Sequence, residues 1–90
     1  MADWNVVAKL RIMPESVETD FEFVKKEVES SVGAKGKIHS MELKHIAFGL
    51  KALEVNILFN DKQGGFEESE QKIRKIKGVG EVETLDLNRL

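Results

Sequence analysis

The stretch LEVNILF, residues 53–59, alternates large apolar residues with a glutamate, an asparagine and one further leucine. This period of two is typical of a β-strand that buries one face. Residues 5–12, NVVAKLRI, show the same alternation and predict another strand. We expect that strand to end at Pro14, because proline cannot donate a hydrogen bond to a neighbouring strand. Both strands are apolar enough to lie in the centre of a sheet.

A helix is predicted after Pro14, because apolar residues there recur every three or four positions. Thr19 and Glu22 have the spacing of a capping box, which indicates that the helix begins there. Gly33 and Gly36 are expected to end it. The predicted buried stripe of this helix consists of Phe21, Val24, Val28 and Val32.

A second helix is predicted after the turn-rich stretch 60–65. Its acidic residues come early and its basic residues late, an order that complements the helix dipole. Two pairs at a spacing of four, Glu68–Lys72 and Glu70–Arg74, favour the same conformation. Residues 78–80, GVG, are expected to end the helix. Its buried positions are predicted to be Phe66, Ser69, Ile73 and Ile76.

Two more strands are predicted at residues 37–46 and 82–87, and both are rich in charged or polar residues. Charges on a strand are typical of sheet edges, where they prevent pairing with other chains. The resulting order, strand-helix-strand-strand-helix-strand, predicts a ferredoxin-like α+β sandwich. With right-handed crossovers, the antiparallel four-stranded sheet has the order 4-1-3-2 and both helices cover one face. We expect residues 1–90 to form a single domain.

The composition narrows the classes of function. Fourteen basic and 16 acidic residues give a net charge of −2, without the positive surplus typical of nucleic-acid-binding proteins. The absence of cysteine excludes disulfides and thiolate chemistry. The sequence contains neither an apolar run of membrane-spanning length nor a signal-peptide pattern. We therefore expect a cytoplasmic protein that binds neither membranes nor nucleic acid directly.

Residues that could carry catalysis or bind metal form no convincing group. His39 and His45 have equal parity on one predicted strand, which places them on one face but roughly 20 Å apart, too far to share a metal. The acidic stretch that includes Asp61 and Glu67 lacks the spacing of a calcium loop, and complementing the helix dipole explains it better. Residues 13–16, MPES, lack the glycine-flanked arginine of an acylphosphatase loop. We expect no catalytic residues, no metal and no cofactor.

RNA binding on the open face of the sheet would require aromatic side chains for base stacking. None stands at the outward positions of the central strands. A ferredoxin-like module that binds a ligand or RNA nevertheless remains the alternative function. The outward positions are Val7, Lys9, Arg11, Glu54, Asn56 and Leu58.

Several apolar or charged residues stand at unusual positions. Phe48 lies in the short connection between two strands, where small or polar residues normally serve, and Gly49 beside it indicates a sharp turn. Its ring either folds back over the core or protrudes as an anchor for a partner protein. Phe23 falls outside the apolar stripe of its helix and is predicted to be exposed. Arg89 and Leu90 are expected to be disordered, since chain ends usually fray.

Four stretches match a known family: MPES at 13–16, IAFGLKAL at 46–53, the glycine pair at 64–65 and GVGEVETLDLNRL at 78–90. Over its whole length the chain resembles the elongation factor 1-beta family, which includes archaeal proteins and the exchange domain of their eukaryotic counterparts. The stretch 46–53 is the most specific, because it joins an aromatic-glycine pair to a lysine and an apolar strand.

This resemblance implies a ferredoxin-like fold and guanine-nucleotide exchange on elongation factor 1-alpha, without covalent chemistry. It implies that Phe48, with Gly49, docks on this GTPase in its GDP-bound and nucleotide-free forms. Arg89, followed by Leu90, matches a basic penultimate residue that reaches toward the magnesium and phosphates of the partner. Eukaryotic members have lysine there, so arginine is a departure, and its planar fork need not copy lysine's geometry.

Overall fold

The computed structural model describes residues 4–33, 36–46, 49–60, 62 and 65–90. Six elements follow one another in the predicted order. They are β1 (Val6–Pro14), α1 (Phe21–Val32), β2 (Gly36–His45), β3 (Lys51–Phe59), α2 (Phe66–Arg74) and β4 (Val79–Arg89). No helix among the described residues is long and apolar enough to cross a membrane.

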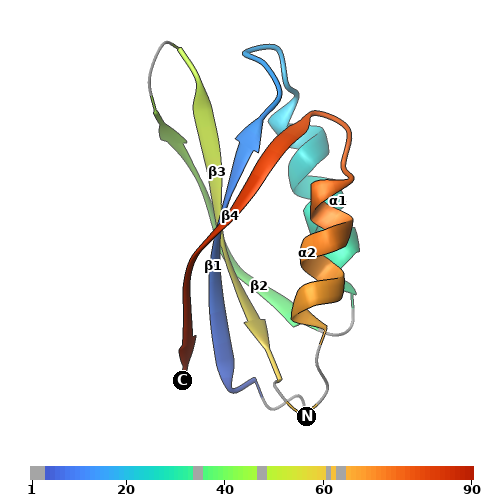
Figure 1. Cartoon of the computed structure of the whole chain (residues 1–90), viewed down its shortest axis with the longest axis vertical. Coiled ribbons are helices and arrows are strands. Elements are labelled where there is room, and N and C mark those ends of the chain that lie inside the picture. Colours follow the sequence, from blue (N-terminus) through green and yellow to red (C-terminus); the bar gives the residue numbers. More distant parts are fainter. Residues whose placement is uncertain (1–3, 34–35, 47–48, 61, 63–64) are drawn as a thin grey trace.

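The four strands form one antiparallel sheet in the order β2-β3-β1-β4. This is the predicted order 4-1-3-2 counted from the other edge. Both helices lie on the same side of the sheet (Figure 1). The ferredoxin-like prediction is therefore confirmed, with the apolar strands β1 and β3 in the centre and the polar strands β2 and β4 at the edges.

The core lies between the sheet and the two helices. Alternate residues of β1 and β3 point into it, so the period of two that predicted these strands also predicted their buried face. The register pairs Ala8 with Ile57 and Leu10 with Val55, so the inward side chains of the two strands stand opposite one another. The core residues are Ala8, Leu10, Ile12, Val24, Val28, Val32, Leu53, Val55, Ile57, Phe59, Ile73, Val79 and Val82.

The cap of helix α1 is Asp20, one residue later than the predicted cap Thr19. The carboxylate of Asp20 accepts hydrogen bonds from the backbone N–H groups of Glu22 at 3.0 Å and Phe23 at 3.4 Å. Thr19 is not the cap, and its hydroxyl instead donates to the carbonyl of Gly78 at 2.9 Å. The prediction was wrong because threonine and aspartate both serve as caps, and only the tertiary contact distinguishes them.

Helix α2 carries the predicted ion pairs. Lys72 lies 3.4 Å from Glu68, and Arg74 lies 3.2 Å from Glu70. The hydroxyl of Thr84 also donates to Glu70 at 3.0 Å, which links α2 to β4. The helix ends at Arg74, earlier than the predicted stripe, and Ile76 packs against the core from the segment that follows.

Strand β2 begins at Gly36, a residue that the sequence assigned to the end of the first helix. Gly36 pairs with Phe59 at the end of β3. A Cβ atom at this position would lie 2.9 Å from each of three neighbours, the carbonyl of Leu58, the ring of Phe59 and a methyl of Val32. Gly36 therefore allows the strand to approach α1 closely, rather than ending the helix.

Candidate functional site

The C-terminal end of the chain is bound to the sheet, contrary to the predicted disorder. Strand β4 runs to Arg89, which pairs with Val6 of β1. Beyond it, the backbone N–H of Leu90 donates to the carbonyl of Asn5 at 2.9 Å, while the N–H of Asn5 donates to Phe59 at 3.0 Å. The prediction failed because it assumed that the last residues of the chain have no partner. In the structure, the end of β4 pairs with the start of β1, and backbone hydrogen bonds hold it there.

An irregularity in β4 determines which face of the sheet Arg89 occupies. Lys9 pairs with Asp86 but Leu10 pairs with Thr84, so Leu85 is an extra residue in the strand. Beyond this β-bulge, Arg89 stands opposite Val6, on the helix-covered face. Without it, the alternation would turn Arg89 to the open face.

An apolar hollow of about 330 Å³ lies on the helix-covered face near Arg89, between β4 and the start of α2. Leu87, two residues before Arg89, borders it and is 51% exposed. The other residues that line it are Val6, Phe59, Asn60, Gly65, Phe66 and Glu67. Arg89, which pairs with Val6 of this lining, therefore stands next to exposed apolar surface.

The connection between β2 and β3 lies at the other end of the sheet (Figure 1). Gly49 has a φ of 76°, as the predicted sharp turn requires, and the N–H of Ile46 donates to the carbonyl of Leu50 at 2.9 Å. Phe48 lies outside the described residues, so the choice between a protruding and a core-covering ring stays a prediction.

These two ends are far apart. Strand β3 alone separates them by about 26 Å at the rise of an extended strand, in a molecule 41 Å long and 20 Å wide. Gly49 and Arg89 therefore cannot contact one small ligand together. If both act, they act on separate surfaces of a large partner.

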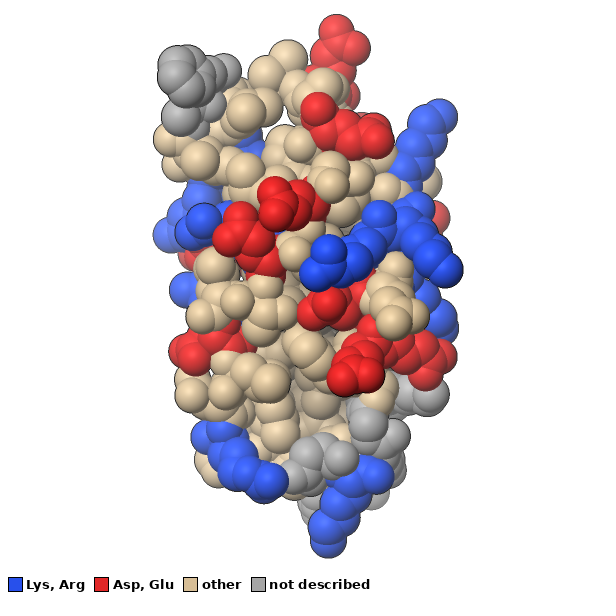
Figure 2. Space-filling view, viewed as in Figure 1, with Lys and Arg blue, Asp and Glu red and all other residues tan. Residues whose placement is uncertain are grey.

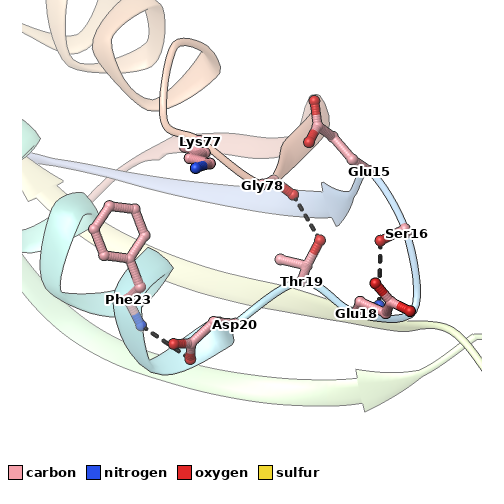
Figure 3. Close-up of a pocket in the computed structure, with 8 residues that line it drawn as sticks. All are labelled: Glu15, Ser16, Glu18, Thr19, Asp20, Phe23, Lys77 and Gly78. Atoms are coloured by element: carbon pink, nitrogen blue, oxygen red, sulfur yellow. Dashed lines mark hydrogen bonds between the residues drawn. The ribbon is translucent and has the colours of Figure 1, made fainter.

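A second hollow, of about 440 Å³, lies at the same end of the molecule as the Gly49 connection, between the β1–α1 loop and the turn before β4. Figure 3 shows the bond from Thr19 to Gly78 that joins its two walls. Phe23 borders the hollow and is 42% exposed, as predicted. The hollow is also lined by Glu15, Ser16, Glu18, Asp20 and Lys77.

The histidines and carboxylates that the sequence analysis considered lie apart from one another in the part of the chain that the structure describes. No group of three histidine, aspartate or glutamate residues in that part of the chain could hold a metal ion, and Asp61 lies outside it. His39 and His45 are both exposed. The register slips between Ile38 and Ser40, so the equal parity predicted for the two histidines does not hold.

On the open face, the outward positions of the central strands are those that the alternation predicted. Lys9 lies 3.5 Å from Glu54 and Arg11 lies 3.9 Å from the same carboxylate. These two cations are therefore already partnered within the chain. Among the described residues, the outward positions of β1 and β3 carry no aromatic side chain on which a base of single-stranded RNA could stack.

Comparison with known proteins identifies the family. Residues 7–90 match the EF-1 guanine nucleotide exchange domain. The chain belongs to this family. Its exchange-domain relatives include elongation factor 1-beta of Methanosarcina acetivorans, 41% identical over 87 residues, which are 96% of this chain and 98% of the relative. Elongation factor 1-beta of Methanothermobacter thermautotrophicus is 38% identical over 86 residues, 96% and 97% of the two chains.

Solved structures outside the exchange-domain family share the fold alone. The ACT domain from GTP pyrophosphokinase of Chlorobium tepidum superposes with a TM-score of 0.63 at 20% identity, over 90% of this chain and 99% of that one. The C-terminal domain of MgtC from Mycobacterium tuberculosis gives 0.66 at 10% identity, over 99% and 92%. Sequence, rather than shape, therefore distinguishes exchange domains from other ferredoxin-like proteins.

Proposed function

We propose that this protein promotes the release of GDP from translation elongation factor 1-alpha in the cytoplasm, so that GTP can replace it. The observation that carries this proposal is the match to the exchange-domain family over residues 7–90. Exchange requires no covalent step, only a protein that binds the GTPase and weakens its hold on the nucleotide. The partner is bound in its GDP-loaded form and more tightly in its nucleotide-free form.

Arg89 supplies the positive charge in the proposed mechanism. Its backbone is anchored by the pairing with Val6 and by the bond from Leu90 to Asn5. A fixed backbone limits the entropy lost when a side chain enters a partner site. A guanidinium placed beside the magnesium and phosphates of bound GDP repels the metal and competes with it for phosphate oxygens. Loss of the metal then weakens nucleotide binding.

Phe48 and Gly49 supply affinity at the opposite end. An aromatic side chain in a partner's pocket is typical of the few residues that dominate a protein–protein interface. Because binding is reciprocal, a factor that binds the empty GTPase more tightly than the loaded one weakens nucleotide binding by the same ratio. The factor accelerates exchange in both directions, and the cellular excess of GTP sets the outcome.

The test is the release of fluorescent GDP from elongation factor 1-alpha at increasing concentrations of this protein. We expect the wild type to accelerate release, and Arg89→Ala to lower the maximal rate by at least about tenfold, the effect of losing one charged interaction. Lys26→Ala, which removes an exposed cation from α1, is the matched control and should leave the rate unchanged. A wild type that binds RNA and leaves GDP release unchanged would replace this function with the RNA-binding alternative.

A further inference from the structure

The loop between β1 and α1 exposes an apolar residue that neither the fold nor the proposed mechanism uses. Val17 is 69% exposed, although the residues beside it are polar or charged. Single exposed apolar residues are common on protein surfaces.

The loop holds Val17 in one place. The N–H of Thr19 donates to the carbonyl of Ser16 at 3.3 Å, so Val17 and Glu18 occupy the two central positions of a tight turn. The hydroxyl of Ser16 accepts from the N–H of Glu18 at 3.2 Å.

The loop is also tied to the turn before β4 by two hydrogen bonds. The carbonyl of Gly78 accepts from the hydroxyl of Thr19 at 2.9 Å (Figure 3) and from the N–H of Glu15 at 2.9 Å. A side chain presented on such a braced turn loses little conformational entropy on binding.

Val17 also borders the connection that carries Gly49. A hollow of about 280 Å³ lies between the two segments, lined by Val17 on one side and by Gly49 and Lys51 on the other. Ile46, at the other end of the connection, is 43% exposed. The β1–α1 loop and the Gly49 end of the β2–β3 connection therefore border one continuous surface at this end of the molecule.

The charges around Val17 indicate what kind of partner fits. Glu15 and Glu18 flank it, both are exposed, and neither forms an ion pair with any residue that the structure describes. Figure 2 shows acidic side chains at this end of the molecule. An apolar tip between two unpaired carboxylates complements an apolar depression rimmed by lysine or arginine.

We propose that residues 14–20 form a second docking element for the same GTPase, in which Val17 enters such a depression and Glu15 and Glu18 pair with its basic rim. This inference rests on the proposed function, because it assigns the partner from it. It adds a loop that is distant from the β2–β3 connection in sequence but adjacent in space to Gly49 of that connection. Binding there raises affinity without touching the nucleotide, since Arg89 lies at the far end.

The experiment measures GDP release against the concentration of this protein, which gives a half-saturating concentration and a maximal rate. For Val17→Ser we expect the half-saturating concentration to rise about five- to tenfold, the effect of one lost apolar side chain at an interface, with the maximal rate unchanged. Leu43→Ser is the matched control, because Leu43 is 36% exposed on the edge strand β2 and belongs neither to this loop nor to the proposed exchange residues. It should leave both parameters unchanged, and thermal melting should show all variants folded.

A second pair of variants tests the charges. Glu18→Lys should raise the half-saturating concentration more than Glu18→Gln does, and added salt should shrink the difference, because exposed charges are screened. If the wild type catalyses release while Val17→Ser and Glu18→Lys match it, the docking element is refuted and exchange stands. The docking element is equally refuted if Val17→Ser changes only the melting temperature or only the maximal rate. If the wild type neither binds nor stimulates the GTPase, both proposals fail.

Discussion

At the scale of single residues, Gly36 shows how one missing side chain sets the distance between two elements. Any Cβ atom there would lie 2.9 Å from a backbone carbonyl as well as from two side chains, and the carbonyl cannot yield without moving β3. We predict that Gly36→Ala lowers the free energy of unfolding by about 1–3 kcal/mol, the usual cost of overpacking. Urea denaturation monitored by circular dichroism measures it.

Lys37→Ala is the control for this substitution, because Lys37 is the next residue of the same edge strand and its side chain is exposed. Its effect should stay within about 0.5 kcal/mol, as for most surface positions. Equal stabilities for the two variants would show that β2 shifts to accommodate the methyl group. The close approach would then not depend on glycine.

Residue roles were the part of the structure that the sequence predicted least well. Thr19 and Asp20 are both good helix caps, so local spacing could not assign the cap correctly. The role of Thr19 is set by Gly78, 59 positions away in sequence. Gly36 was assigned to the end of the first helix for the same reason, because its actual constraint comes largely from Leu58 and Phe59 of β3, which are distant in sequence. Arg89 was placed by sequence on a frayed end, although pairing with Val6 fixes it.

At the scale of elements, the start of α1 depends on one carboxylate. Asp20 accepts two backbone N–H groups that would otherwise lack partners within the helix. We predict that Asp20→Ala destabilises the protein by about 1 kcal/mol. Asp20→Ser should retain most of the stability, because serine caps as well as aspartate. Thermal melting of the two variants decides the point, and an Asp20→Ser variant as unstable as Asp20→Ala would show that charge rather than capping is what matters.

Element boundaries followed the alternation wherever the strand was regular. Strands β1 and β3 matched their predicted spans closely, because each buries one face throughout. Strand β4 did not: it runs from Val79 to Arg89, because residues 78–80 were assigned to the end of the second helix and the last residues to a frayed chain end. The bulge at Leu85 was not predicted either. A signal was present: Glu83 and Asp86 both face outward opposite Arg11 and Lys9, yet they are three positions apart. An odd spacing between two outward charges indicates an extra residue.

At the scale of the whole molecule, the architecture was predictable because its order and polarity leave few choices. Two apolar strands must lie inside the sheet, two polar strands must lie at its edges, and right-handed crossovers place both helices on one face. What the sequence did not reveal is the distance between the two candidate contact points. Gly49 and Arg89 lie at opposite ends of the sheet in a molecule 41 Å long. In the proposed mechanism, the residues that supply affinity are therefore separate from the residue that displaces the nucleotide.

This separation predicts how the two ends combine. Phe48→Ala should raise the half-saturating concentration for GDP release, whereas Arg89→Ala should lower the maximal rate. Because sites more than about 10 Å apart usually contribute independently, the double variant should show the product of the two effects to within about twofold. The measurement is GDP-release kinetics on the wild type, the two single variants and the double variant, which together form a double-mutant cycle. A much smaller combined loss would mean that both residues act on the same part of the GTPase. A Phe48→Ala variant with normal half-saturation and a lower melting temperature would instead place its ring over the core.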